Sequence, residues 1–469
     1  MISGASVLIV LFIAECSPFT LITTLAHLFF RVRKNLTTKG PTFESLVLEP
    51  EKYATVADAF KKLVSLSKVV PRVERIATPE SYGRVLAENI VPRVDLPSRP
   101  VSHMDGYAVN ALSLAEASEE KPVRLQFRGE VRLGEIQKRR LGRGEAIRVP
   151  TGGYLPSGAD AVVPVERATA RGKFVFVAKY HSAGSFVYPK GADVARGVRV
   201  LDRGRQLRPQ DVGLLLSLGI DKVAVYRRPR VAIIATGNEL TDSLTGLHHG
   251  RVRNSHGFVF SKLVEEMGGV AVDLGVVKDD VKKIARMVKQ ALGKAEMVVT
   301  IGGTSLGGLD LVGDTLRKFV KPSQIVHGIR MDRGRVAGVT AIQGKPVVML
   351  PGPIQGAMSA FALFVAPMIG AIGGHDATMN RPVKATLTEA WEARKRFPNF
   401  TKVVYVRLSP AEAGLEAAPM VGETESMTIL TGANGYVIVP EERTEIPKGG
   451  TVEVHLLPGF SYLADRLFD

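Results

Sequence analysis

The chain contains a single cysteine, Cys16, among its 469 residues. One cysteine forms no disulfide within the chain and supplies no cysteine-rich zinc site. The nine histidines show neither an HExxH nor an HxH arrangement, so a histidine-based zinc site is not indicated either. A metal bound by this protein would need oxygen ligands, which favours a hard cation such as Mg²⁺.

Signatures of nucleotide-driven and nucleic-acid-binding proteins are also missing. There is no GxxxxGK[ST] loop, and no GxGxxG follows the first candidate strand of the α/β region, which argues against a nucleotide-driven motor and a dinucleotide dehydrogenase. We find no zinc-finger spacing, helix-turn-helix signal or RRM-like aromatic motif. Lys and Arg number 62 against 46 Asp and Glu, a net charge of +16. Such a charge attracts nucleic acid, anionic lipid or polyanionic small molecules, but without a recognition motif we read it as a charge-rich surface and predict no nucleic-acid partner.

The composition is that of a globular protein with several domains. Hydrophobic residues make up 45% and charged residues 23% of the chain, and 47 Gly and 27 Pro are spread along it. A chain of this length exceeds the size at which a single core stops growing. We find no long-period repeat and no low-complexity segment.

Residues 5–30 are strongly apolar and are followed by the basic run Arg31-Val-Arg-Lys34. Their length permits a membrane anchor, yet Glu15 and Pro18 interrupt the middle and no basic region precedes them, as a signal peptide requires. Three alternatives stay open for residues 1–40: an artefact of start-site choice, an anchor and a packed helix. We expect a cytoplasmic protein, with membrane contact only if this segment is real.

The predicted secondary-structure pattern changes several times along the rest of the chain. Apolar spacing predicts a helix over 54–66, and short β-rich runs divided by Gly and Pro extend from 91 to 200. From residue 230 strands alternate with helices, and after about 381 short strands return. We expect an apolar extension at 1–40, a helical linker domain from 41–90 and 191–228, a β-rich domain at 91–190, an α/β domain at 229–378 and a β barrel at 379–469.

Within the α/β region the elements are specific enough to place. Continuous apolar runs predict buried parallel strands, and helical patterns between them predict helices on both faces of the sheet. The predicted strands are 231–235, 270–277, 297–301 and 347–350, and the predicted helices are 256–267 and 280–292. In the C-terminal region we predict strands over 402–408, 435–439 and 451–457.

Polar residues and glycines gather after these four strands. The segments are Thr236-Gly-Asn-Glu239, Lys278-Asp-Asp280, Gly302-Gly-Thr-Ser-Leu-Gly-Gly-Leu-Asp310 and Pro351-Gly-Pro-Ile-Gln-Gly356. Ligands of open parallel sheets bind beyond the carboxyl ends of the strands. Gly-rich loops let backbone amides approach a phosphate, and carboxylates suit Mg²⁺ between phosphates. One such loop is often only a tight turn, but four at one sheet edge predict an anion-binding site.

Two segments of the β-rich region can also be interpreted as purely structural turns. Ser102-His-Met-Asp-Gly-Tyr-Ala108 reads in isolation as an Asp-Gly turn beside a packed tyrosine. Arg148-Val-Pro-Thr-Gly152 reads as an ordinary turn.

Taken in order, these segments resemble the molybdopterin molybdenumtransferase family, known as MoeA, whose relatives include the E domain of gephyrin. The similarity runs from about residue 50 to the C-terminus. The matching segments are Met104-Asp-Gly-Tyr-Ala108, Thr151-Gly with Gly158–Val163, Gly191-Ala-Asp193, Leu214–Gly219, Thr236–Glu239, Gly302–Ser305 with Asp310, and Leu350-Pro-Gly352.

The resemblance implies an elongated, four-domain homodimer. Its α/β domain would be a three-layer domain like that of MogA, the partner that adenylylates molybdopterin, with a parallel-rich sheet. It also implies a β-rich insertion carrying the MDGYA segment and a C-terminal β barrel. The implied activity is insertion of molybdate or tungstate into adenylylated molybdopterin, with Mg²⁺-dependent release of AMP. The molybdopterin adenylyltransferase is a possible protein partner, and the sequence does not separate molybdate from tungstate.

The resemblance also implies site residues. It places the catalytic carboxylates at Asp105, Asp193, Glu239 and Asp310, with Asp105 reaching in from a neighbouring subunit. Glu239, Asp279 and Asp310 are the implied Mg²⁺ ligands, with Glu239 and Asp310 as the main pair. The substrate-binding set is Thr151, Thr236, Gly237, Gly302, Gly303, Thr304, Ser305, Arg333, Arg335, Pro351 and Gly352.

Three positions depart from the family pattern. A KPGKP-like segment is replaced by Met331-Asp-Arg-Gly-Arg-Val336, which keeps positive charge at Arg333 and Arg335 but places Asp332 where a lysine is usual. Asn238 replaces a common Asp, and PGPIQG replaces PGNP. Two other functions are kept open: a molybdopterin adenylyltransferase-like enzyme and a non-catalytic molybdopterin-binding scaffold.

Overall fold

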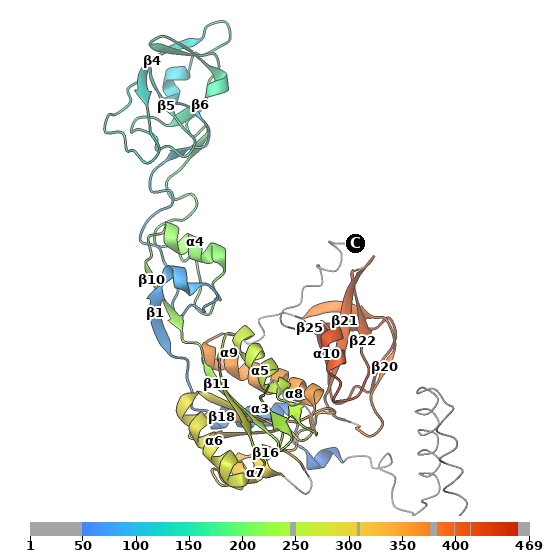
Figure 1. Cartoon of the computed structure of the whole chain (residues 1–469). Coiled ribbons are helices and arrows are strands. Elements are labelled where there is room, and N and C mark those ends of the chain that lie inside the picture. Colours follow the sequence, from blue (N-terminus) through green and yellow to red (C-terminus); the bar gives the residue numbers. More distant parts are fainter. Residues whose placement is uncertain are drawn as a thin grey trace, which may run out of the picture.

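The computed structural model describes residues 49–243, 250–306, 310–375, 382–397, 399–412 and 414–457. The apolar segment at 5–30 lies outside these residues, and so does the choice among its three alternatives. The described chain is elongated, with a β-rich unit at one end, a slender stalk, and an α/β unit beside a small barrel at the other end (Figure 1).

A six-stranded sheet forms the centre of the α/β unit, in the order β14-β11-β15-β18-β17-β16. The first four are parallel neighbours, and β17 and β16 add antiparallel strands at one edge. The bounds are β11 Arg230–Thr236, β14 Val270–Val277, β15 Met297–Ile301, β16 Val326–His327, β17 Gly338–Ile342 and β18 Lys345–Leu350.

Both faces of this sheet are covered by helices, because successive strand residues point to opposite sides. In β11, Val231 and Ile233 pack into one core with α3, α5 and the α8–α9 segment. Ala232 and Ile234 pack into the other core with α6 and α7. The helix bounds are α3 Val56–Leu66, α5 Ser255–Glu266, α6 Val281–Lys294, α7 Leu311–Leu316, α8 Ile354–Ala360 and α9 Ala366–Gly373.

The α8–α9 segment is the most apolar helical stretch of the described residues. Over Ile354–Gly373, with a π-helical turn at Phe361–Val365, its mean hydropathy of 1.8 and its length of 20 residues would fit a membrane span. Two thirds of it is nevertheless buried inside the protein, against the central sheet. It is therefore the core helix of the α/β unit.

The stalk and the β-rich unit are inserted between α3 and β11. In the stalk, β1 (Val73–Ala77) pairs antiparallel with β10 (Lys222–Tyr226) beside α4 (Pro209–Ser217). The β-rich unit has a six-stranded sheet in the order β6-β3-β5-β4-β8-β7. Its strands are β3 Gly106–Val109, β4 Val123–Glu130, β5 Glu145–Val149, β6 Ala161–Pro164, β7 Ala168–Arg171 and β8 Phe174–Val177, and the short β2 Val101–Ser102 and β9 Val187–Tyr188 pair at its base.

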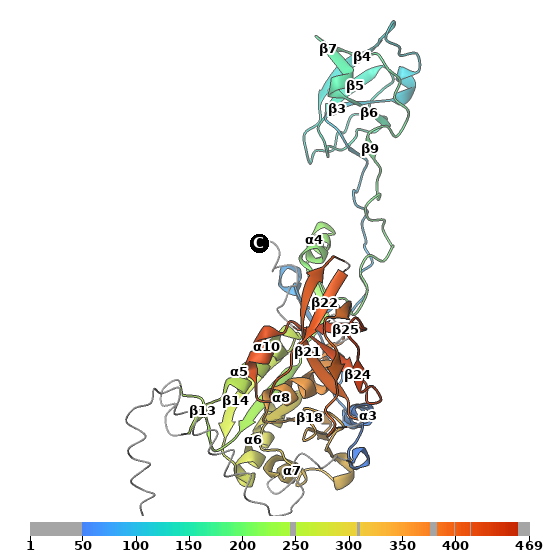
Figure 2. The same cartoon turned by 90° about the vertical axis from the view of Figure 1, so that its right-hand side faces the viewer.

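The C-terminal unit is a closed barrel in the order β19-β22-β21-β23-β25, with a core of its own. It lies against the α/β unit in both views (Figure 2). The strands are β19 Val383–Leu387, β21 Lys402–Ala411, β22 Gly414–Pro419, β23 Gly435–Val439 and β25 Thr451–Leu456, with β20 Trp391–Glu392, β24 Glu445–Ile446 and α10 Met427–Gly432 around them.

The predicted fold class is confirmed: an α/β unit with a parallel-rich sheet, a β-rich insertion and a C-terminal barrel. The strands predicted over 270–277, 297–301 and 435–439 coincide with β14, β15 and β23. One assignment differs from the structure. The helix predicted over 54–66 and placed in the linker domain is α3, which packs through Ala59 and Leu63 on the α/β sheet. The domain boundaries themselves stay predictions.

The two phenylalanines of α5 offer a test of this packing. Phe260 is fully buried, with its ring 5.5 Å from that of Phe361, whereas Phe258 is 65% exposed. We expect Phe260→Ala to lower the free energy of unfolding of the α/β unit by about 3–5 kcal/mol. Phe258→Ala, two residues away on the same helix, should cost less than about 1 kcal/mol. Urea denaturation of both variants measures this, and equal losses would contradict the packing.

Candidate functional site

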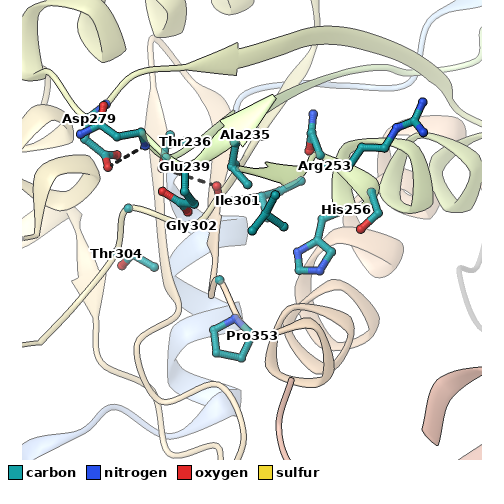
Figure 3. A pocket seen from close by; sticks show the side chains of 18 of the residues that line it. Ala235, Thr236, Glu239, Arg253, His256, Asp279, Ile301, Gly302, Thr304 and Pro353 are labelled. Atoms are coloured by element: carbon teal, nitrogen blue, oxygen red, sulfur yellow. Dashed lines mark hydrogen bonds between the residues drawn. The ribbon is translucent and has the colours of Figure 1, made fainter. Parts of the chain in front are cut away.

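A cavity of ≈ 680 Å³ lies at the carboxyl ends of β11, β15 and β18. Figure 3 shows side chains from the three strand ends and from the start of α5 around it. The predicted residues that line it are Thr236, Gly237, Glu239, Asp279, Gly302, Gly303, Thr304 and Gly352. The strand-end segments are thus brought together at one sheet edge, as the sequence predicted.

Asn238 and Asp279 hold the ends of β11 and β14 together. The amide of Asn238 donates to Asp279 Oδ2 at 3.1 Å, and the amide of Asp279 donates to Asn238 Oδ1 at 3.2 Å. An aspartate at position 238 would place a second carboxylate beside Asp279. The asparagine keeps the hydrogen bonds without that repulsion.

The other carboxylate oxygen of Asp279 is left without a partner. Oδ1 is buried and accepts no hydrogen bond from the described residues, although a buried acceptor normally has a partner. The exposed Glu239 lines the same cavity. No group of three or more His, Cys, Asp or Glu side chains within the described residues is arranged as a complete metal site. Two carboxylates, one with a free oxygen, fit a hard cation that takes its remaining ligands from water or substrate.

The loop after β15 depends on its two glycines. Gly302 and Gly303 have φ values of +80° and +62°. A Cβ on Gly303 would lie 2.3 Å from Thr236 Oγ1, so no other residue fits there. No hydrogen bond joins the amides of Gly303 and Thr304 to another described residue. Successive free amides in left-handed backbone form an anion-binding concavity.

Asp310 lies behind this loop and not in the cavity wall. It caps α7 by accepting from the amide of Gly313 at 3.1 Å, and it accepts from Arg317 at 3.1 Å. His327 Nδ1 lies 3.0 Å from the same carboxylate, and His327 Nε2 lies 2.8 Å from Thr304 Oγ1. Asp310 is therefore linked to the cavity through His327 and Thr304.

These contacts keep Asp310 ionised. Burial alone would raise its pKa, but the hydrogen bonds from His327 and from two backbone amides outweigh burial and hold the pKa below its usual range. Ser305, also predicted as a binding residue, lies behind the cavity wall and directs its amide to Asp310 at 3.4 Å.

The sequence prediction missed the opposite wall of the cavity. Arg253, Asn254, Ser255 and His256, at the start of α5, all line it. Asn254 caps α5 by accepting from the amide of Gly257 at 3.0 Å. Burial lowers the pKa of His256, so the imidazole is neutral near pH 7. The sequence signal that could have indicated this wall is the Asn-Ser pair before the helical pattern, because Asn is a preferred N-cap residue.

A second cavity, of ≈ 350 Å³, adjoins the first, because Pro353 lines both. It contains the predicted residues Arg333, Arg335 and Pro351, and it lies between the α/β unit and the barrel. The sequence did not point to its other cations, Arg394 and Arg396, or to Phe397, whose ring has Arg335, Arg394 and Arg396 within 6 Å of its centroid.

The unusual Asp332 has a buried carboxylate that forms an ion pair with Arg394, whose side chain is 45% exposed. The Asp332 side chain is 9% exposed, and both carboxylate oxygens accept from Arg394 Nε at 3.1 and 3.2 Å. The negative charge is thus compensated within the cavity wall. The departure in the PGPIQG loop is similar, since Gln355 accepts from Arg333 and donates to the barrel carbonyls of Glu423 and Ser426.

The remaining predicted residues lie far from both cavities within one chain. Asp105 and Thr151 belong to the β-rich unit, at the opposite end of the molecule from the α/β unit in both views. The carboxylate of Asp105 accepts from the amide and hydroxyl of Thr151 at 2.7 and 2.8 Å, which holds the pKa of Asp105 below its usual range. Asp193 is exposed in the connection between β9 and α4, where its amide donates to the carbonyl of Leu96 at 3.0 Å.

The network around Asp310 predicts a pH-dependent contribution to stability. A carboxyl whose pKa is depressed on folding stabilises the protein above its unfolded pKa, here 3.8, and loses that contribution as pH falls through the folded value. We expect Asp310→Asn to lower the free energy of unfolding by about 1–2 kcal/mol at pH 7. The difference should disappear in acid below the folded pKa.

Asp314→Asn is the matched control, because Asp314 also pairs with Arg317 on α7 but is 62% exposed. It should change the free energy of unfolding by less than about 1 kcal/mol. Urea titrations at several pH values measure both variants. A loss for Asp310→Asn that persists unchanged in acid would contradict the assignment.

Comparison with known proteins covers nearly all of the described chain. The model of the MoeA N-terminal region (domains I and II) matches residues 54–219, a probable molybdopterin-binding domain matches 232–371, and the MoeA C-terminal region (domain IV) matches 384–457. Among curated proteins, the chain is 29% identical over 415 residues to the molybdopterin molybdenumtransferase of Staphylococcus aureus (strain MSSA476), covering 88% of this chain and 97% of that protein.

A Staphylococcus epidermidis protein of the same name is 28% identical over 412 residues, covering 87% of this chain and 96% of that protein. The crystal structure of the molybdopterin biosynthesis MoeA protein from Pyrococcus horikosii is 30% identical with a TM-score of 0.75, covering 87% of this chain and all of the other. With these three regions matched in order and a solved MoeA structure matched over its full length, the chain belongs to the MoeA family of molybdopterin molybdenumtransferases.

Proposed function

We propose that this protein inserts molybdate or tungstate into the dithiolene of adenylylated molybdopterin, with Mg²⁺-dependent release of AMP. The observation that carries the proposal is the junction of two unlike cavities at Pro353. One combines carboxylates with free backbone amides, and the other gathers arginines. A phosphoanhydride and an oxyanion therefore have adjacent sites.

The first cavity suits the phosphates of the substrate. The amides of Gly303 and Thr304, which have no hydrogen-bond partner among the described residues, would bind phosphate oxygens, since left-handed backbone at Gly302 and Gly303 favours an anion-binding concavity. Glu239 and Asp279 would hold Mg²⁺ through their carboxylates, because both side chains line this cavity. When bound there, Mg²⁺ supplies charge neutralisation for cleavage of the phosphoanhydride.

Asp310 has a positioning role in this proposal. Its carboxylate is occupied by Arg317, His327 and backbone amides, so Mg²⁺ is assigned to Glu239 and Asp279 rather than to the Glu239–Asp310 pair expected from the sequence. Through His327, Asp310 orients the hydroxyl of Thr304 at the cavity wall.

The second cavity suits the tetrahedral oxyanion. Arginine binds oxyanions through its planar set of N–H donors. Arg333 is held in place by Gln355 and by the carbonyl of Gly422, and Arg335 lies over the ring of Phe397. Asp332 does not repel the oxyanion, because Arg394 neutralises it. The cavity offers no feature that selects between molybdate and tungstate, dianions of nearly equal size.

The position of Asp105 supports a homodimer. Asp105 and Thr151 belong to the β-rich unit, which the stalk separates from the α/β unit of the same chain (Figures 1 and 2), and Asp193 lies in the connection between β9 and α4. They act on the reaction if a second copy places its β-rich unit over the first cavity. We place the enzyme in the cytoplasm, where the adenylyltransferase that supplies the substrate is the possible protein partner.

Two other functions are less well supported. An adenylyltransferase-like activity would rest on the α/β unit alone and would leave the arginine cavity and the β-rich unit without a role. A scaffold would need no free cation ligands, whereas Asp279 has one. Adenylylation of molybdopterin with ATP tests the first, and tight binding of the substrate without AMP release tests the second.

AMP release with each oxyanion is the direct test of the reaction. We expect the wild type to release AMP only with Mg²⁺ and molybdate or tungstate. Glu239→Gln and Asp279→Asn should each lower the rate at least about 100-fold, because each removes a ligand of the cation. The matched control is Asp273→Asn, an exposed carboxylate on β14 outside the cavity, which should keep the wild-type rate. Oxyanion-independent release would sink the proposal.

A mixing experiment tests the dimer. Asp105→Asn and Glu239→Gln should each be inactive alone, and subunits exchanged at equal ratio should recover about a quarter of the wild-type rate. Half of the dimers would then be mixed, and in each of them one site receives an intact Asp105 and an intact Glu239. If both residues act within one chain, no mixture of the two variants regains activity.

A further inference from the structure

A third cavity, of ≈ 480 Å³, lies at the amino ends of the central strands, whereas the proposed reaction site lies at their carboxyl ends. It is formed where the stalk joins the α/β unit, at the amino ends of β11 and β18 and the C-terminal end of α6. The lining residues are Lys68, Val69, Val70, Arg72, Arg227, Arg230, Gly293, Lys294, Ala295, Glu296, Gln343, Gly344 and Lys345.

The side chains that line this cavity are predominantly positively charged. Six of its lining side chains are basic and one is acidic. The single carboxylate, of Glu296, accepts from the amide of Arg230 at 2.8 Å, and Lys345 donates to the carbonyls of Leu292 and Ala295 at 2.5 and 2.8 Å. These two charges have structural roles at the end of α6, which leaves five cations.

The five remaining cations have no ion-pair partner within the part of the chain that the structure describes. Among the described residues, no carboxylate lies within salt-bridge distance of Lys68, Arg72, Arg227, Arg230 or Lys294. Elsewhere in the stalk arginines are paired: Arg205 and Arg208 both bind Asp211, and Arg84 binds Glu74. Like charges gathered in a concavity raise the local concentration of anions.

The cavity also joins two parts of the molecule. Residues 68–72 lead from α3 into the stalk, and residues 227–230 return from the stalk to β11. The two connections are side by side, since the amide of Arg227 donates to the carbonyl of Arg72 at 2.7 Å. Arg72 and Arg227 therefore sit on the stalk side, while Arg230 and Lys294 belong to the α/β unit.

We propose that this cavity, here called the stalk-base site, binds a small anion with two or more phosphate groups, which bridges the stalk to the α/β unit. A chain of phosphates places charge near both groups of cations at once, as a single phosphate does not. The lining holds no aromatic ring on which a base would stack. The occupant is thus the phosphate chain itself, free of a nucleoside.

Occupation of the stalk-base site reduces motion between the two units. A ligand that contacts both connections favours the orientations of the stalk in which Arg72 and Arg227 face Arg230 and Lys294. The binding itself does not depend on the proposed reaction, because the site lies at the other edge of the sheet.

Isothermal titration with inorganic tripolyphosphate on the full chain tests the site. We expect Arg72→Gln with Arg227→Gln to weaken binding at least about tenfold, because two charge-assisted contacts are lost. The matched control is Arg124→Gln with Arg171→Gln, which removes the same charge from exposed positions in the β-rich unit. It should bind like the wild type. Arg333→Gln with Arg335→Gln should not change the affinity for tripolyphosphate. This variant therefore distinguishes binding at the stalk-base site from binding in the oxyanion cavity.

Small-angle X-ray scattering supplies a second readout. After correction for interparticle effects, tripolyphosphate should narrow the distribution of molecular dimensions of the wild type and of the control. It should leave that distribution unchanged for the Arg72→Gln, Arg227→Gln variant. Equal binding by that variant, or an equal loss in the control, overturns the proposal. So does tighter binding of a short DNA duplex that depends on the same two arginines, which would make the cavity part of a nucleic-acid surface.

Discussion

Parallel pairing of β14, β11, β15 and β18 is the constraint on which the candidate site depends. Parallel strands all end at one edge, so the four loops that follow them converge although they are separated by many residues in the chain. The helices that make the pairing possible also bury both faces of β11, β15 and β18. The polar residues of the loops therefore supply the hydrogen-bonding groups of the cavity, beside the apolar Ala235 and Ile301 at the strand ends.

The three departures from the family pattern share one property in the structure. Asn238, Asp332 and Gln355 each contact a charged residue in a cavity wall: Asp279 through paired amide bonds, Arg394 through an ion pair, and Arg333 through a hydrogen bond. They hold these charged residues in place. A substitution in such a position shifts how a charge is held without removing it.

The sequence was informative wherever a residue's surroundings are set by its own strand. Apolar runs located β14 and β15 to the residue, and the order of the strands placed Glu239, Asp279 and Gly303 at one edge. It was uninformative where distant segments meet. Nothing in the sequence near Arg394 indicates that it neutralises Asp332, 62 residues earlier. Nor does a lone His327 reveal the link between Asp310 and Thr304, because tertiary packing creates it.

The insertion of the stalk and the β-rich unit between α3 and β11 has a consequence for synthesis on the ribosome. α3 emerges early, yet the sheet residues that cover Ala59 and Leu63 follow only after the whole insertion. Until then an amphipathic helix stays without its partner, while the inserted units can complete their own cores. Chains fold in the order in which complete units appear. The core around Ala59 and Leu63 is thus completed only after the whole insertion has been synthesised.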